Sequence, residues 1–332
     1  MLTTTVVFPE KDKVEVRQVE PYEVKPDQIM IETERSLVST GTELRCLQHG
    51  FASDATQWAD WVQYPFNTGY CAAGTVIEVG KDVSQFTVGD RVAGFGEHRR
   101  HTVIDASYAT KVPDGLSFDE AAWFSLGAIV QYGYRLAKPL LGETIVVVGL
   151  GNLGQLCARY ARIGGAGDLI AIDPSPSRLH FVENIATHTL ACGVEEAVDA
   201  VRDITSGRMA EVVYEVTGHP PVFGPCQRLA ALNGRIVTMG DTGHAEQQCN
   251  TPELSLHNLT IVGANPEITA AKSDWPHPRS GDTFFKFLQR GQMDVKELIT
   301  HRFPVEKAPE VYDMLIRDRG STVGVLFTYE NA

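Results

Sequence analysis

Up to about residue 120, hydrophobic and polar positions alternate in short stretches that glycine and proline separate. This pattern is typical of strands in a β-rich unit. Five stretches are predicted to be strands: VEVRQVE (14–20), IMIETE (29–34), GTVIEVG (74–80), DRVAGFG (90–96) and HTVIDAS (101–107). The stretch 51–64 fits either a short helix or a lid, because no sustained period decides between them.

From residue 117 onward, helical segments alternate with apolar runs. A helix is predicted from Phe118 to Ala137, with Ser117 as its N-cap and Glu120 completing a capping box. Strands are predicted at TIVVV (144–148), LIAID (169–173), EVVYEVTG (211–218), GRIVTMG (234–240) and LTIVGA (259–264), and helices at LGQLCARYARIGGA (153–166), RLHFVENIA (178–186) and CQRLAALN (226–233). This alternation indicates an α/β fold with a doubly wound parallel sheet.

The last part of the chain mixes two helices (282–292 and 308–318) with the strand GVLFTY (324–329), and it is expected to fold back onto the β-rich unit. The predicted organisation is therefore a β-rich domain over 1–122, an α/β domain over 123–265, and a segment over 266–332 that completes the β-rich domain.

Composition narrows the class of protein. The chain has 332 residues, of which 43% are hydrophobic, enough for two buried cores. Its formal net charge of −13 disfavours nucleic acid and anionic lipid as partners. No apolar run is long enough for a membrane helix, and the N-terminus does not resemble a signal peptide. The six cysteines form no CxxC pair, which favours free thiols in a reducing cytoplasm.

A dinucleotide site is predicted in TIVVVGLGNLGQL (144–156), which places Gly149, Gly151 and Gly154 in G-x-G-x-x-G spacing. The first glycine permits a tight turn, the second lets the backbone approach a pyrophosphate, and the third lets the helix pack close to the strand. The start of the helix then offers free N–H groups to the phosphates.

The end of the second strand indicates which dinucleotide is bound. Asp173 lies 19 positions after Gly154, and a carboxylate there can accept hydrogen bonds from the ribose hydroxyls and repel a 2′-phosphate. NAD is therefore the predicted cofactor. Two alternatives remain open, since Asp173 could cap a helix and Arg178 could reach a phosphate.

Gly218 and Gly240 stand at the carboxyl ends of predicted strands, where ligands of open α/β sheets bind. A plain turn at either glycine is the alternative. The predicted cofactor residues are Gly149, Gly151, Asn152, Leu153, Gly154, Asp173, Arg178, Thr217, Gly218 and Gly240.

The segment GYCAAGTVIEVGKDVSQFTVGDRV (69–92) carries a glycine and valine pattern that resembles the medium-chain dehydrogenase/reductase superfamily. The matching positions are Gly74, Val76, Gly80, Phe86, Gly89, Asp90 and Val92. The resemblance extends over nearly the whole chain. It implies a GroES-like catalytic domain interrupted by a Rossmann domain, and an assembly of two or four copies.

The resemblance also shows what this chain lacks. Zinc-dependent members hold their catalytic zinc with residues at positions that correspond here to Thr40, in a predicted loop, to Tyr70 and to Ala128. A threonine, a tyrosine and an alanine do not provide the three ligands that catalytic zinc needs. The chain is therefore similar to the zinc-independent branch, and no metal is predicted.

An unexpected metal site of Cys71, His98 and His101 is disfavoured, because two loop histidines and one thiol have no matching further ligand. His98 is instead expected at the surface, and His101 packed.

Without zinc, hydrogen-bonding side chains must assist proton transfer. Tyr70 is the first candidate for acid, base or oxyanion donor, although it could also only fill the space that zinc leaves. By resemblance, Glu43 matches an acid next to the zinc site and could orient Tyr70 or act as the base, while Thr42 matches a relay hydroxyl. Thr40 is expected to hydrogen-bond in the pocket wall.

The predicted function is zinc-independent, NAD-dependent oxidation of a secondary hydroxyl in a sugar, polyol or cyclitol-like substrate, or reduction of the ketone. A quinone or enone reductase is the second hypothesis, and a non-catalytic nucleotide-binding protein is the third.

Overall fold

The computed structural model describes residues 2–52, 56–240, 242–264 and 275–329. The chain falls into two compact units. The first unit consists of residues 1–50, 57–128 and 273–332, and the second of residues 51–56 and 129–272. The first unit therefore continues to Ala128, whereas the predicted domain boundary followed residue 122. The boundary predicted at 265/266 lies outside the described residues.

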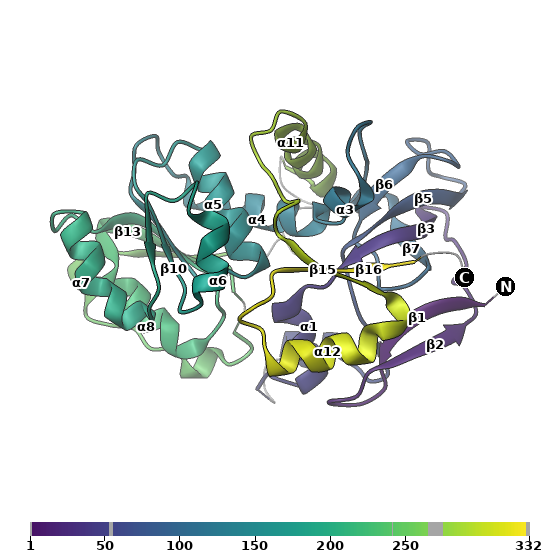
Figure 1. The fold of residues 1–332 in the computed structure, drawn as a ribbon, viewed down its shortest axis with the longest axis horizontal. Coiled ribbons are helices and arrows are strands. Elements are labelled where there is room, and N and C mark those ends of the chain that lie inside the picture. The colour runs from purple at the N-terminus through teal and green to yellow at the C-terminus, as the bar shows by residue number, and fades with distance from the viewer. Residues whose placement is uncertain (1, 53–55, 241, 265–274, 330–332) are drawn as a thin grey trace. The chain divides into compact units, whose positions relative to one another are not determined.

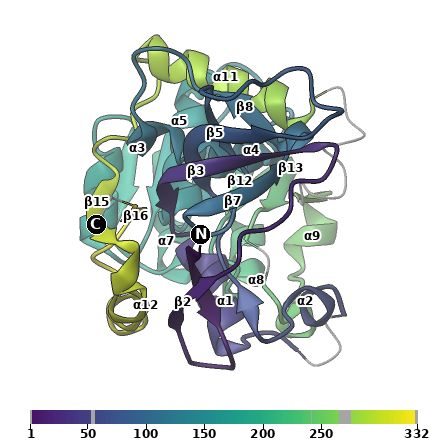
Figure 2. The ribbon, with the colours of Figure 1, turned by 90° about the vertical axis from the view of Figure 1, so that its right-hand side faces the viewer.

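The first unit is built on a seven-stranded sheet with the order β15-β16-β3-β5-β6-β8, in which β7 also pairs with β3 (Figure 2). A second sheet of three strands has the order β2-β1-β4. The strands are β1 (Thr3–Phe8), β2 (Glu15–Val19), β3 (Gln28–Leu37), β4 (Phe66–Asn67), β5 (Ala72–Val79), β6 (Arg91–Gly94), β7 (His101–Asp105), β8 (Ala109–Lys111), β15 (Ile299–Pro304) and β16 (Gly324–Thr328). Six of these strands were predicted, including β16, whereas β1, β4, β8 and β15 were not.

The helices of the first unit include one at a place where the sequence analysis expected a loop. Helix α1 runs from Thr40 to Gln48, so Thr40 begins a helix. Ser117 caps α3 through the predicted capping box with Glu120. The predicted 20-residue helix is nevertheless interrupted between Ala121 and Phe124. The helices are α1 (Thr40–Gln48), α2 (Thr56–Trp61), α3 (Phe118–Ala121), α4 (Phe124–Ala137), which continues into the second unit, α11 (His277–Gln289) and α12 (Ala308–Arg317).

The second unit contains a six-stranded parallel sheet with the order β11-β10-β9-β12-β13-β14 (Figure 1). The chain moves outward from β9 on one side and then resumes with β12 on its other side, which is the strand-order reversal of a doubly wound fold. Its elements are β9 (Ile145–Val148), α5 (Asn152–Ile163), β10 (Leu169–Ile172), α6 (Pro176–Leu179), β11 (His188–Leu190), α7 (Val194–Ile204), β12 (Ala210–Glu215), α8 (Pro220–Arg228), β13 (Ala230–Thr238), α9 (Glu253–Leu256) and β14 (Thr260–Gly263).

Two helix predictions in this unit were partly wrong. Helix α8 ends at Arg228, and the segment predicted as its continuation forms the start of β13. Ala230 is fully buried and pairs with Ala210 of β12, so sheet pairing overrides the helical propensity of LAAL. Of the stretch 178–186, only α6 and a short 3-10 helix to Val182 are helical.

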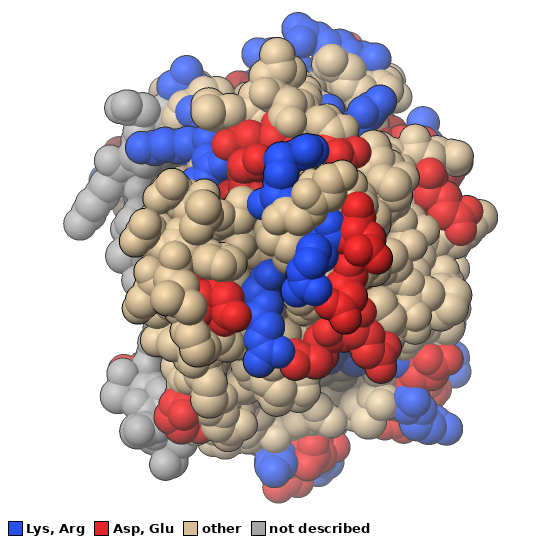
Figure 3. All heavy atoms as spheres, turned by 90° about the vertical axis from the view of Figure 1, so that its left-hand side faces the viewer, with Lys and Arg blue, Asp and Glu red and all other residues tan. Residues whose placement is uncertain are grey.

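Each unit has its own apolar core. Val146, Ile170, Val213 and Ile236 come from four neighbouring strands of the parallel sheet and are fully buried. The surface carries acidic and basic side chains next to one another, as Figure 3 shows for one face. Arg228 of α8, for example, pairs with Glu195 of α7 at 2.5 Å. No helix among the described residues is long and apolar enough to cross a membrane.

Candidate functional site

The glycine turn between β9 and α5 has the geometry that its spacing predicts. Gly149 has a φ of +92°, which favours glycine. A Cβ added at Gly154 would lie 1.8 Å from the carbonyl oxygen of Gly149, so only glycine lets the helix approach the turn this closely. A Cβ at Gly151, the N-cap of α5, would meet nothing within 4 Å. The backbone at Gly151 is therefore open on the side from which a phosphate would approach.

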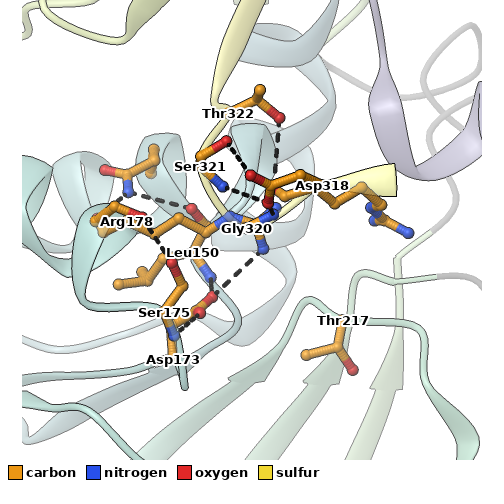
Figure 4. A network of polar contacts seen from close by, with 12 residues as sticks. Leu150, Asp173, Ser175, Arg178, Thr217, Asp318, Gly320, Ser321 and Thr322 are labelled. Atoms are coloured by element: carbon orange, nitrogen blue, oxygen red, sulfur yellow. Dashed lines mark hydrogen bonds and ion pairs between the residues drawn. The ribbon is translucent and has the colours of Figure 1, made fainter. Parts of the chain in front are cut away.

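Asp173 lies directly after β10 and beside this turn (Figure 4). One carboxylate oxygen accepts the backbone N–H of Leu150 at 2.7 Å, and the other accepts that of Ser175 at 2.8 Å. Arg178 lies 3.8 Å from the carboxylate. A carboxylate has about four acceptor sites, so Asp173 can hold the turn and still accept hydrogen bonds from a ribose.

A second turn follows β12 in the same sheet. Thr217 lies there (Figure 4), next to Gly218, whose φ is +60°. The buried Glu215 accepts hydrogen bonds from the backbone N–H of Thr217 at 2.7 Å, from its hydroxyl at 2.5 Å and from the N–H of Gly218 at 3.1 Å. A Cβ at Gly240 would lie 2.2 Å from the nitrogen of Gly218, so the two glycines pack together. Glu215 was not among the predicted site residues, although it lies within the predicted strand, two positions before Thr217.

In the first unit, the hydroxyl of Tyr70 meets two hydroxyls from the start of α1. Ser39 Oγ lies 2.5 Å from the Tyr70 hydroxyl, and Thr42 Oγ1 lies 3.3 Å from it. Ser39 is the N-cap of α1, yet its side chain makes no capping hydrogen bond to the helix. The serine hydroxyl is directed to Tyr70 instead. Thr40, one position further, is buried at the first position of the helix.

The buried carboxylate of Glu43, on the same helix α1, makes polar contacts with several segments of the chain. It accepts the backbone N–H of Ser39 at 2.6 Å, contacts His98 Nε2 at 3.0 Å and accepts the hydroxyl of Thr68 at 3.3 Å. The hydroxyl of Tyr312, on α12, also donates to it. We call these residues, with Ser36 and Tyr329, the Glu43 network. Its outer members continue from His98 Nδ1, which lies 2.7 Å from Ser36 Oγ, to the Tyr329 hydroxyl, 2.8 Å from the same serine.

The Glu43 network corrects two expectations. His98 is fully buried, because both of its ring nitrogens have partners inside the protein, and it is not a surface residue. From the sequence, Glu43 could either orient Tyr70 or act as the base itself. Its hydrogen-bond partners among the described residues are instead Ser39, Thr68, His98 and Tyr312. Glu43 therefore positions the two segments that flank Tyr70 and does not hydrogen-bond Tyr70 itself.

The pKa values of Glu43 and Tyr70 shift in opposite directions. Burial tends to raise the pKa of Glu43, but His98, Tyr312 and the Ser39 N–H outweigh it and lower that pKa, so the carboxylate is ionised. Burial raises the pKa of Tyr70 well above its usual value. The neighbouring Cys71 and Glu43 raise it further, while the hydrogen bonds with Ser39 and Thr42 offset only part of the increase. Tyr70 is therefore protonated at neutral pH and suited to donate a hydrogen bond.

The residues at the positions of zinc ligands do not fit a catalytic zinc. A tyrosine must ionise to bind zinc well, and the raised pKa of Tyr70 opposes this. Thr40 offers only a neutral hydroxyl, and the buried Ala128 offers no side-chain donor. Within the described part of the chain, no three or more His, Cys, Asp or Glu residues are grouped so that they could hold a metal ion.

Comparisons with known proteins identify the family of this chain. The family model described as "Alcohol dehydrogenase GroES-like domain" matches residues 25–125. The family model described as "Zinc-binding dehydrogenase" matches residues 152–275. Sorbitol dehydrogenase of Bacillus subtilis (strain 168) is 24% identical over 297 residues, which cover 80% of this chain and 81% of that protein. D-guloside 3-dehydrogenase of Escherichia coli (strain K12) is 27% identical over 254 residues, covering 74% and 73%. A solved Sinorhizobium meliloti structure, described as of the zinc-binding dehydrogenase type and bound to NADP, has a TM-score of 0.81 at 21% identity, covering 99% and 100%.

A GroES-like unit combined with a Rossmann-like unit defines an oxidoreductase of the alcohol dehydrogenase type. The chain belongs to the medium-chain dehydrogenase/reductase superfamily. The resemblance and the fold class predicted from the sequence are both confirmed.

The buried charge of Glu43 gives a first prediction. We expect Glu43→Gln to lower the free energy of unfolding at pH 7 by about 3 kcal/mol, because the buried groups that donate hydrogen bonds to the Glu43 carboxylate lose a charged acceptor. Urea denaturation measures this, with Glu310→Gln on the exposed face of α12 as the control, which should unfold at the same urea concentration as the parent.

The pH dependence of that difference follows from the direction of the shift. The pKa of Glu43 is lowered on folding, so its stabilisation is present above the unfolded pKa and is lost as the pH falls through the folded pKa. The difference between parent and variant should therefore shrink in acid. Equal stability at pH 7 would contradict the importance of the Glu43 network.

The glycine turn offers a matched pair of variants. Gly154→Ala should destabilise the protein by about 1–3 kcal/mol or more, because its Cβ would overlap the Gly149 carbonyl. Gly151→Ala should fold with the stability of the parent and yet bind NADH at least about 10-fold more weakly, since its methyl group stands where the pyrophosphate approaches. Urea denaturation and NADH fluorescence titration measure both. Unchanged NADH affinity in Gly151→Ala would show that the dinucleotide does not bind at this turn.

Proposed function

We propose that this protein is an NAD-dependent dehydrogenase that oxidises a secondary hydroxyl of a sugar, polyol or cyclitol-like substrate, or reduces the corresponding ketone, without zinc. The observation that carries the proposal is the cluster of the Ser39, Thr42 and Tyr70 hydroxyls, in which Tyr70 stands, by the family resemblance, at the position of a zinc ligand. The names of the relatives, sorbitol dehydrogenase and D-guloside 3-dehydrogenase, support a polyhydroxylated substrate.

In this proposal, side chains of the first unit carry out the proton transfer. Tyr70 donates a hydrogen bond to the substrate oxygen, and Ser39 and Thr42 hold its hydroxyl and pass protons onward. A bound nicotinamide would supply the hydride acceptor or donor. In ketone reduction, Tyr70 gives its proton to the oxygen as hydride arrives at carbon. In alcohol oxidation, the same phenol must first be ionised to take that proton.

The raised pKa of Tyr70 therefore favours ketone reduction near neutral pH. Because the ionised phenol accumulates only at high pH, the rate of alcohol oxidation should rise with pH throughout the alkaline range in which the protein is folded. The position of Asp173 supports NAD, since its carboxylate at the end of β10 would repel a 2′-phosphate. The NADP found in the Sinorhizobium meliloti structure makes this preference a point to test.

The proposed assembly is a homodimer or homotetramer in the cytoplasm. Strand β14 ends the described parallel sheet, and Ile261 on it is 38% exposed. An edge strand with exposed apolar residues can pair with a second copy.

The reaction is tested by a screen of sugars, polyols, cyclitols, simple alcohols and quinones for NAD-linked absorbance changes, with metal analysis of the same sample. Tyr70→Phe should lower the turnover of the best substrate by about 10²–10⁴-fold and leave NADH affinity unchanged. Tyr22→Phe, which removes an exposed hydroxyl, is the control. Stoichiometric zinc, or full turnover in Tyr70→Phe, would disprove the proposed chemistry, and activity confined to quinones would favour a quinone reductase.

The cofactor preference is tested at Asp173. Asp173→Asn keeps an oxygen that can accept the Leu150 N–H but removes the negative charge. We expect the ratio of kcat/KM for NADP to that for NAD to rise by about 10-fold or more, because repulsion of the 2′-phosphate is lost. Arg178→Gln in the same background should reverse part of the gain if Arg178 holds that phosphate. A ratio unchanged by Asp173→Asn would show that Asp173 does not select the cofactor.

A further inference from the structure

His277 is a buried histidine to which the mechanism above gives no role. It begins helix α11 and is 3% exposed. Its ring lies against Phe95, with ring centroids 4.7 Å apart, and against Tyr108 at 5.0 Å. Among the described residues, its Nε2 atom has no hydrogen-bond partner. Buried polar atoms in native proteins nearly always have a partner, so a nitrogen without one among the described residues is a candidate contact for a ligand.

The aromatic neighbours connect His277 to Tyr70. Phe95 stacks against Tyr70 with ring centroids 6.4 Å apart and an angle of 16° between the planes. Tyr70 and His277 therefore contact the same phenylalanine. Tyr70, Phe95 and Tyr108 are all partly exposed, and their row of ring contacts connects Tyr70 to His277.

The state of His277 limits what it can bind. Burial lowers the pKa of His277, so the ring is neutral at neutral pH. A neutral imidazole nitrogen either donates or accepts one hydrogen bond, depending on the tautomer. A hydroxyl group can do both, and it therefore fits either tautomer. A phosphate or carboxylate would find no positive charge on this ring.

We propose that His277 binds a second hydroxyl of the substrate while Tyr70 contacts the reacting oxygen. This inference rests on the proposed function and narrows it. It assigns an uncharged substrate with at least two hydroxyls, preferred over a simple alcohol and over a phosphorylated sugar. Phe95 and Tyr108 would contact the apolar face of the carbon skeleton between the two hydroxyls.

The experiment compares the best polyol of the screen with its monodeoxy analogues. The parent protein should prefer the polyol over one particular analogue by about 10- to 100-fold in kcat/KM, because that analogue leaves Nε2 without a partner. His277→Leu should bring the ratio of kcat/KM for the polyol to that for this analogue close to one, mainly by lowering kcat/KM for the polyol. His277→Gln, whose amide can still bond a hydroxyl, should retain part of the preference. His180→Gln on the exposed surface is the control and should leave every ratio unchanged.

The outcomes separate the two proposals. Suppose that the parent turns over polyols, and that His277→Leu folds, binds NADH normally and keeps every ratio of kcat/KM between the polyol and its analogues. The proposed role of His277 is then wrong, and the proposed function stands. If His277→Leu slows the polyol and all analogues equally, His277 is only structural, and the inference is likewise overturned. If the parent binds NADH but turns over no polyol, the proposed function fails, and this inference fails with it.

Discussion

The arrangement of the first unit depends on one buried carboxylate. Glu43 is almost free of solvent, so its negative charge must be matched by groups inside the protein. Those groups come from the N-cap of α1, from the segments around Thr68 and His98, and from Tyr312 on α12. These segments are far apart in the sequence. Because Thr68 precedes Tyr70 by two residues and Ser39 bonds its hydroxyl, the same carboxylate also sets where the phenol lies.

The Glu43 carboxylate also affects the acidity of Tyr70. A negative charge near a phenol disfavours the phenolate, and burial acts in the same direction. The neutral phenol of Tyr70 therefore cannot act on a substrate oxygen in the way that a zinc ion does. Zinc stabilises an alkoxide by its positive charge, whereas Tyr70 can stabilise developing negative charge only by donating a proton or a hydrogen bond. In the proposed reaction without zinc, the direction in which oxygen gains a proton is therefore the easier one.

Much of the second unit could be predicted from the sequence, because its signals are local. The spacing of Gly149, Gly151 and Gly154 after an apolar strand defines the turn within a few residues. The first unit was harder to predict. The partners of Glu43 are separated from it by up to 269 positions, and no local pattern relates them. Helix α1 was missed because its Thr-Gly-Thr start has low helical propensity, and its N-cap region is held by tertiary contacts. The end of α8 was misplaced because burial of Ala230 in the sheet outweighs propensity.

Two departures from local rules meet near Tyr70, and together they argue for a binding site there. A serine at an N-cap normally bonds the backbone of its own helix, which stabilises the helix by roughly 1 kcal/mol, and Ser39 bonds Tyr70 instead. A buried imidazole nitrogen is normally satisfied, and Nε2 of His277 has no partner in the described part of the protein. Proteins tend to break such rules at functional sites. Because Phe95 contacts both Tyr70 and His277, the two departures lie along one row of rings, where a single ligand can account for both.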